Sequence, residues 1–273
     1  MSNPLYMNDL QEIMGGMSIA NDVILNSSVL SKFLGNQERV DIFHRNYIGY
    51  LGEFYSKYLM DIYVFCLSEH DPKDYDGRLS MWRGYGKNGD GAAIVFKTDY
   101  LRKREDSPLI FVKVMYKSDQ ERRNIIEEKI DSFCESLVGC DIESDSIYYI
   151  SYYLFQFMKF ISLSIKHIGF GEETEWRVIY LPERNVNGII PESCLDYVVG
   201  PRGIEPKLKL PIAPLAFDVP QQWNLCDIID RIILGPTISS PISLQSVKRM
   251  LSKINKTELE NKVFVSSIPL RKI

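Results

Sequence analysis

The sequence has few of the residues that build metal sites and disulfide frameworks. Its 273 residues include only five cysteines and three histidines. The cysteines are widely spaced and form no C-x-x-C pair, which predicts reduced thiols and argues against a zinc site. No histidine has the i,i+4 partner that is typical of a metal-binding helix. We therefore expect no bound metal.

A basic excess is also missing. The chain has 32 lysines and arginines against 36 aspartates and glutamates, which gives a formal net charge of -4. Proteins that wrap around a phosphate backbone usually carry a clear positive excess. The composition therefore disfavours non-specific nucleic-acid binding.

The sequence also lacks a membrane-length apolar segment that is free of charged and strongly polar residues. The most apolar run, Ile147 to Ile165, is long enough to span a bilayer, but it contains Gln156 and Lys159. A lysine near the centre of a membrane helix is costly, so we predict a core helix and no membrane association. The start, Met1 to Tyr6, lacks the basic and apolar blocks of a secretory signal, which favours a cytoplasmic protein. Without repeats or low-complexity blocks, we expect one domain over residues 1–273.

What the sequence does contain is an alternation of helical and strand-like segments. Helical spacing of apolar residues predicts helices over 9–14, 23–34, 38–58, 120–137, 144–167 and 244–253. Short β-rich runs predict strands at 61–69, 91–96, 109–116, 175–181, 194–201, 231–236 and 263–268. This mixture predicts an α+β fold around a mainly antiparallel sheet, which is either continuous or split.

One candidate ligand loop is "LSMWRGYGKNGDGAAIVF", Leu79 to Phe96. In its compact turn, Ser80 to Gly86, the rings of Trp82 and Tyr85 can stack on a planar group, and Arg83 can grip a phosphate or carboxylate. The glycines would let backbone N–H groups approach an anion closely. The alternative is an aromatic corner that packs under a hairpin, with Arg83 paired to a carboxylate. Spacing alone leaves both interpretations open.

The second candidate is the acidic segment "GFGEETEWRVIY", Gly169 to Tyr180. Alternation along a strand would place Glu173, Glu175 and Arg177 on one face. Two neighbouring carboxylates raise each other's pKa, which suits an acid/base role or the stabilisation of a cationic transition state, and Arg177 can orient one of them. A solvated edge strand is the alternative interpretation.

Five motifs, taken in order, resemble a bacterial family known as domain of unknown function 2971. They run from residue 6 to residue 271 and are "YMNDLQE", "CLSEHD" with the loop that follows it, "FGEETEWR", "IILGP" and "SSIPLR". The family pattern is in turn similar to ADP-ribosyltransferase-type folds. In those folds a split antiparallel sheet holds NAD, and a glutamate on a late strand steadies the ribose while the nicotinamide bond breaks.

This resemblance implies an enzyme that consumes NAD as its substrate. Glu175 or Glu173 would be the catalytic glutamate. The expected nucleotide-binding residues are Ser80, Trp82, Arg83, Tyr85, Gly86 and Arg177. The enzyme would transfer ADP-ribose to a protein or nucleic-acid acceptor or hydrolyse NAD, as a toxin or phage-defence effector does.

Two other functions fit the same residues. The first is a non-catalytic nucleotide-sensing or protein-interaction module of a bacterial defence or regulatory system. Family members generally carry an aromatic strand before the Asn-Asp motif, whereas only Met1 to Leu5 precede Tyr6 here, and this departure favours the module. The second is a metal-dependent nuclease that uses Glu172, Glu173 and Glu175, although no D-x-D or H-x-H arrangement accompanies them. The oligomeric state does not follow from the sequence.

Overall fold

The chain folds into two compact units, each assembled from separate segments. The computed structural model describes residues 1–7, 10–98, 107–200, 202–210, 224–238 and 240–270. The first unit comprises Met1–Leu67, Ile110–Arg184 and Leu195–Leu208, and the second comprises Ser68–Leu109, Asn185–Cys194 and Lys209–Ile273. The organisation as a single domain stays a prediction.

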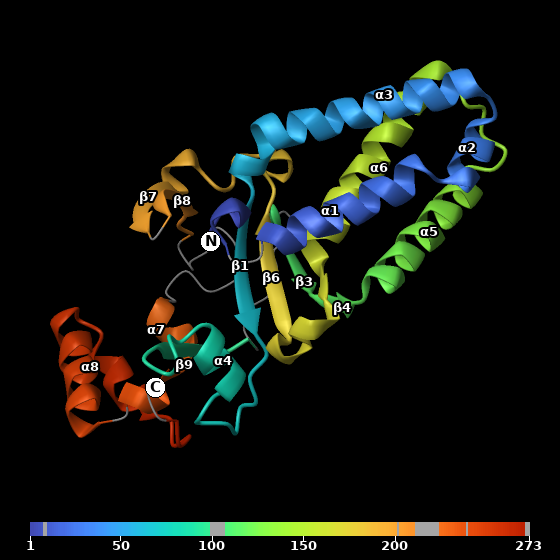
Figure 1. Ribbon diagram of the computed structural model, residues 1–273. Coiled ribbons are helices and arrows are strands. Elements are labelled where there is room, and N and C mark those ends of the chain that lie inside the picture. The colour runs from blue at the N-terminus through green and yellow to red at the C-terminus, as the bar shows by residue number, and fades with distance from the viewer. Residues whose placement is uncertain (8–9, 99–106, 201, 211–223, 239, 271–273) are drawn as a thin grey trace. The chain divides into compact units, whose positions relative to one another are not determined.

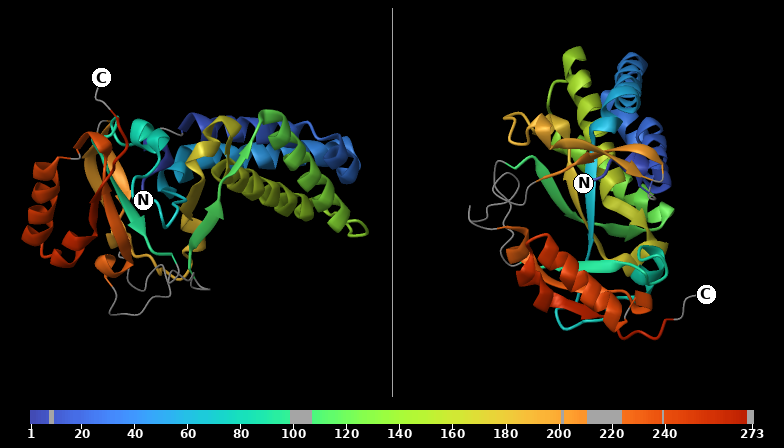
Figure 2. Two further views of the ribbon diagram at one scale, coloured as in Figure 1. Left: turned by 90° about the horizontal axis from the view of Figure 1, so that it is seen from below. Right: turned by 90° about the vertical axis from the view of Figure 1, so that its left-hand side faces the viewer.

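Long helices dominate the first unit. They are α1 (Leu10–Leu25), α2 (Ser28–Leu34), α3 (Gln37–Glu53), α5 (Asp119–Ser136) and α6 (Ser144–Ser164). Helix α6 packs against α1 and α3, and α5 packs against α1 and α2 (Figure 1). Figure 2 shows these helices gathered together in two further views. The described residues of the unit also form short helical turns: η1 (Pro4–Tyr6), the π-helical η2 (Phe54–Tyr58), η3 (Leu59–Asp61), η4 (Ile168–Glu173) and η5 (Pro182–Arg184).

The apolar run at 147–165 is a core helix, as predicted. Ile147, Ile150, Leu154 and Met158 recur at helical spacing in α6 and are buried in the main core of the unit. Within the described ranges, no helix combines the length and apolar character that crossing a bilayer requires.

Several predicted helix boundaries are wrong. The sequence predicts a short turn at 9–14 and a helix at 23–34, whereas α1 continues through Gly15 and Gly16 to Leu25. Packing on α6 explains the continuation, because Gly16 lies against Ser162 of that helix. The break falls at Ser27, whose hydroxyl accepts a hydrogen bond from the Leu30 N–H at 3.2 Å and caps α2.

Replacing two exposed glycines of the helical region with alanine should change the free energy of unfolding in opposite directions. Gly49 lies inside α3, and a Cβ added there would meet nothing within 4 Å, so Gly49→Ala should stabilise the protein by about 1 kcal/mol. Gly35 ends α2 with a φ of +86°, so Gly35→Ala should destabilise it by about 1 kcal/mol despite equally open space. Urea unfolding of both variants tests this, and the same sign for both would contradict it.

The strands of the first unit form small sheets. Three of them, β1 (Tyr63–Ser68), β6 (Glu175–Tyr180) and β3 (Leu109–Lys113), are ordered β1-β6-β3. Two pairs accompany them: β4 (Met115–Lys117) runs parallel to β5 (Ile165–His167), and β7 (Leu195–Gly200) runs antiparallel to β8 (Gly203–Leu208). Ser2 forms single bridges to Val64 and Lys207, which tie β1 to β8. Residues 165–167 form strand β5, so the helix predicted at 144–167 ends earlier, at Ser164.

The described residues of the second unit form a small sheet with a separate core. Its elements are α4 (Leu79–Gly84), β2 (Ala92–Phe96), η6 (Glu192–Cys194), α7 (Leu225–Ile228), β9 (Ile229–Leu234), η7 (Pro236–Ile238), α8 (Pro241–Lys253), η8 (Thr257–Lys262) and β10 (Val263–Val265). Strand β9 runs antiparallel to β2 and parallel to β10. Its buried residues pack with Leu251 of α8 and Leu259 of η8. Together the two units confirm the α+β class.

Candidate functional site

The predicted pair Glu175 and Arg177 is buried in the first unit, at the start of β6. The Arg177 Nε donates to Glu175 Oε1 at 2.7 Å, and Nη2 donates to Oε2 at 3.1 Å. The remaining guanidinium nitrogen, Nη1, donates to the carbonyl oxygen of Leu163 at 2.9 Å, at the end of α6. This fork-to-carboxylate geometry is the strongest form of an arginine ion pair. Arg177 thus ties β6 to the last turn of α6.

Lys166 of β5 adds a second cation to the cluster and is completely buried. Its Nζ lies 2.6 Å from Glu173 Oε2 and 3.5 Å from Glu175 Oε2. The same ammonium lies 4.7 Å from the centroid of the Phe170 ring, within range of a cation–π contact. Two cations and two carboxylates therefore form one largely buried cluster.

Strand alternation is the wrong explanation for the position of Glu173. This residue ends η4, and Thr174 after it has a φ of 40°, so β6 begins only at Glu175. The shared contact with Lys166 brings the two carboxylates together. Lys166 escaped the sequence reasoning, although a lysine directly after the apolar run is a visible signal.

The expectation of a raised pKa is wrong for Glu175. Burial alone would raise the pKa of this carboxyl group, but the hydrogen bonds and charge of Arg177, with Cys66 and Lys166, hold the pKa below its ordinary value. Its backbone N–H also donates to the Tyr116 hydroxyl at 2.8 Å. Glu175 is thus a fixed, ionised carboxylate and is poorly suited to transferring protons at neutral pH.

Glu173 is the carboxylate of the cluster with access to solvent. Its side chain is 16% exposed, compared with 5% for that of Glu175. Phe170, which covers Lys166, is also well exposed. A ligand that reaches the cluster from solvent would therefore meet Glu173 and Phe170 first.

In the second unit, the side chain of Trp82 is buried inside the turn predicted to bind a ligand. Its indole N–H donates to the carbonyl oxygen of Asp76 at 2.8 Å. A Cβ added at Gly86 would lie only 2.9 Å from Trp82 Cε3, and one at Gly77 only 3.1 Å from Nε1. The aromatic-corner interpretation therefore describes Trp82, and its ring has little surface left for a ligand.

The polar residues of the same turn lie at the surface. Ser80 and Arg83 are exposed on α4, and Tyr85, which follows the helix, is 56% exposed. No described residue pairs with the Arg83 side chain through a hydrogen bond or salt bridge. The carboxylate partner expected in the aromatic-corner interpretation is thus not found among the described residues. Ser80, Arg83 and Tyr85 remain the predicted nucleotide contacts with open surface.

The glycines of this turn bond within the protein. Gly86 and Gly89 both donate to the Trp82 carbonyl oxygen, at 3.2 and 3.1 Å, and Gly91 donates to that of Gly86 at 3.0 Å. Gly235, in the "IILGP" motif, donates to the Gly91 carbonyl oxygen at 2.8 Å. These two glycine motifs therefore fit closely against each other. With its N–H already bonded, Gly86 gains no support from its geometry for the predicted role in anion binding.

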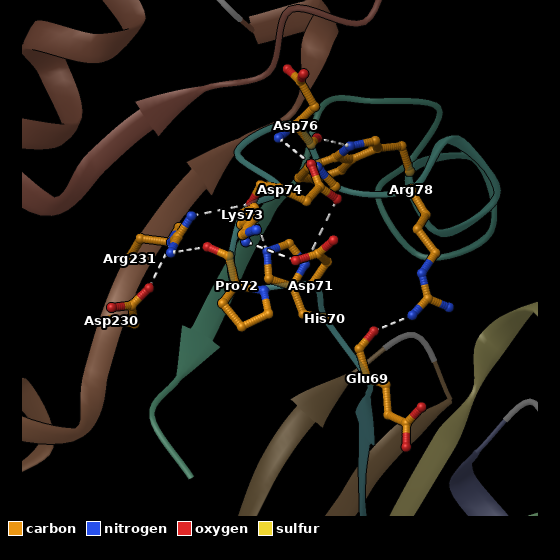
Figure 3. A network of polar contacts seen from close by, with 12 residues as sticks. Glu69, His70, Asp71, Pro72, Lys73, Asp74, Asp76, Arg78, Asp230 and Arg231 are labelled. Carbon is orange, nitrogen blue, oxygen red and sulfur yellow. Dashed lines mark hydrogen bonds and ion pairs between the residues drawn. The ribbon is translucent and has the colours of Figure 1, made fainter. Parts of the chain in front are cut away.

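The segment before α4 is a hydrogen-bonded loop, Glu69 to Arg78 (Figure 3). Asp74 organises it: Oδ1 accepts from the backbone N–H groups of Asp76 at 2.7 Å and Gly77 at 3.0 Å. His70 Nε2 lies 2.8 Å from the Asp74 carbonyl oxygen. The Asp74 carboxylate thus stabilises the geometry of the turn.

Arg231 of β9 anchors this loop to the sheet of the second unit (Figure 3). Its Nη2 donates to the Pro72 carbonyl oxygen at 2.7 Å, and its Nη1 donates to that of Asp74 at 3.2 Å. The guanidinium carbon lies 3.9 Å from the Tyr75 ring centroid, and Nε donates to Asp230 at 2.6 Å. Sequence reasoning missed this residue, because nothing local to "RIILGP" points to a loop so distant in sequence.

A metal site is not evident in the described residues. No group of three or more His, Cys, Asp or Glu side chains there could hold a metal ion.

Comparison with known proteins supports one resemblance. A family described as "Protein of unknown function (DUF2971)" matches residues 81–178, from α4 to β6. No curated protein and no solved structure matches the chain. The resemblance to domain of unknown function 2971 is therefore supported over that segment, whereas the similarity to ADP-ribosyltransferase folds gains no support.

Proposed function

We propose that the first unit carries the catalytic carboxylates of an NAD-consuming enzyme, with Glu173 as the carboxylate that faces the ribose. The observation that supports this is the partly exposed Glu173 beside the ionised, immobile Glu175. Lys166 contacts both carboxylates, and Arg177 neutralises Glu175. Glu173 thus keeps a fixed orientation while part of it stays in reach of a ligand.

The proposed chemistry needs a carboxylate and no proton donor. When the bond from ribose C1′ to the nicotinamide nitrogen breaks, its electron pair leaves with nicotinamide and positive charge develops on the ribose. A fixed carboxylate stabilises that charge in a site with little water. Water then yields ADP-ribose and a proton, or a nucleophile of a protein or nucleic-acid acceptor takes the ADP-ribose. NAD loss or acceptor modification would suit a toxin or phage-defence effector.

The test is nicotinamide release from NAD, followed by chromatography, with the purified chain alone and with cell lysate as a source of acceptors. Glu173→Gln keeps the shape of the side chain but removes its charge, and we expect it to lower the rate by at least about 100-fold. Glu172→Gln, which changes an exposed neighbouring carboxylate, is the matched control and should stay active. Full activity of Glu173→Gln would overturn the role proposed for this residue.

A second candidate function is a non-catalytic nucleotide-binding module. It is favoured by the state of Glu175, because both of its carboxylate oxygens already accept hydrogen bonds from Arg177. A module of this kind would gain thermal stability with NAD or ADP-ribose by mass action, yet release no nicotinamide. Stabilisation without product would therefore favour the module over the enzyme.

A further inference from the structure

Four tyrosines form an exposed aromatic face on α6 of the first unit. Tyr148, Tyr149, Tyr152 and Tyr153 are 52%, 70%, 42% and 56% exposed. Their i, i+1, i+4, i+5 spacing places them on one side of the helix, opposite the buried isoleucines and leucine of the core. Contiguous exposed apolar surface of this kind is often an interaction site.

Neighbouring rings hold Tyr148, Tyr152 and Tyr153 in place. Tyr50 of α3 lies edge-on to Tyr148 and Tyr152, with centroids 5.5 and 5.4 Å apart. On the other side, Phe133 of α5 stacks on Tyr153 at 4.8 Å with an interplanar angle of 8°. Rings that are ordered before association lose little conformational freedom on binding. The surface is therefore preformed.

Charge distinguishes between the partners that this face can bind. From Ser146 to Met158 the sequence contains no Asp, Glu, Lys or Arg. A neutral face offers nothing that would select an acidic or a basic partner, but it can meet its own copy without repulsion between like charges. Interface cores are rich in tyrosine and poor in charged residues, with a polar rim, and the charged helix α5 supplies such a rim here.

The exposed area of the four tyrosines is also large enough for the core of an interface. Four tyrosines that are about half exposed present on the order of 400 Å². Two copies would bury roughly twice that area, which is enough for the core of a standard interface of about 1,600 Å². A hollow of about 250 Å³ between α5 and α6, lined by Phe133, Tyr153 and Phe157 among others, adds concave surface beside the tyrosines.

We propose that this tyrosine face is a homodimer interface, in which α6 of one chain packs on α6 of a second copy about a twofold axis. In a twofold interface the same patch is buried on both chains, and only residues close to the axis meet their own counterparts. We place Tyr149, the most exposed of the four tyrosines, close to this axis. The face is separate from the Lys166–Glu175 cluster, so dimerisation does not depend on the proposed catalytic function.

The test is sedimentation velocity of the full chain from about 1 to about 100 µM, where a micromolar dimer would dissociate on dilution. Wild type should form dimers that dissociate on dilution. Tyr149→Glu and Tyr149→Lys should each weaken the dimer at least about 10-fold, because a buried charge would face its own copy. An equimolar mixture of the two variants should recover dimers, because opposite charges then face one another.

Tyr197→Glu is the matched control, since Tyr197 lies on β7 of the same unit and is 59% exposed. It should dimerise like the wild type, and circular dichroism should show all variants folded. A wild type that is monomeric throughout, or a Tyr149→Glu variant that dimerises normally, would overturn the proposal. Failure of the mixture to dimerise would also overturn it, because the two Tyr149 positions would then not face each other.

Discussion

Glu175→Gln should destabilise the first unit by roughly 3 to 5 kcal/mol, as breaking a buried ion pair from one side generally does. The substitution preserves the shape of the side chain but leaves two buried cations, Arg177 and Lys166, with a single carboxylate between them. Arg177 would also lose a bidentate acceptor while its guanidinium stays buried. Urea unfolding followed by circular dichroism measures the loss directly.

Two controls accompany this measurement. Glu172→Gln, at an exposed position, should change the free energy of unfolding by no more than about 0.5 kcal/mol. Glu173→Gln should cost less than Glu175→Gln, because Lys166 keeps its contact with Glu175. A Glu175→Gln variant as stable as the wild type would contradict the buried cluster.

The pH dependence of the effect has a defined sign. Because the pKa of Glu175 in the folded protein lies below its ordinary value, its stabilising contribution is complete above the ordinary pKa, about 4.3. The contribution is lost as the pH falls through the lower, folded-state pKa. The stability difference between wild type and Glu175→Gln should therefore be constant near neutral pH and shrink in acid. A difference that grows in acid would show that the pKa is raised.

This instability affects how activity data are interpreted. If Glu175 were the catalytic glutamate, as the family resemblance implies, Glu175→Gln would be expected to abolish activity while leaving the fold intact. In the structure, the same substitution removes the partner of two buried cations, so lost activity would follow from unfolding as readily as from chemistry. Glu173→Gln is therefore the more informative variant for catalysis.

The charged cluster shows which side-chain contacts the local sequence pattern predicts and which it misses. Strand alternation correctly places Glu175 and Arg177 together, because both lie in the regular strand β6. It fails for Glu173, which lies before the strand, and it cannot find Lys166. That lysine lies on β5, and the turn η4 returns the chain so that its Nζ contacts Glu173 and Glu175. The pairing of β5 with β4, which joins segments about 50 residues apart, is not encoded by any local pattern.

The fold shows the same division between local and long-range information. The periodicity of α6 is strong enough to predict a core helix from apolar spacing alone. The glycines in α1 suggest a break that packing against α6 overrides. In the turn Ser80 to Gly86, residue type indicates aromatic and basic chemistry, but only the structure shows that Trp82 is buried while Arg83 and Tyr85 are exposed.

Gly235→Ala should destabilise the second unit by roughly 3 kcal/mol, at the upper end for overpacking. A Cβ at this position would lie 2.2 Å from the carbonyl oxygen of Gly89 and 2.9 Å from that of Gly91. These are backbone atoms, so no side chain can rotate away, and the hydrogen bond from Gly235 to Gly91 would be strained as well. Thermal unfolding without any ligand measures the effect.

Gly84→Ala is the matched control for this prediction. Gly84 ends α4 in the same unit, and a Cβ there would meet nothing within 4 Å, so we expect a change of no more than about 0.5 kcal/mol. If Gly235→Ala lowers stability in the absence of ligand, close backbone packing requires the glycines of the turn at Gly86 to Gly91 and of the "IILGP" motif. If it leaves stability unchanged, the two motifs do not pack as the structure shows, and the glycine N–H groups would again be candidates for binding an anion.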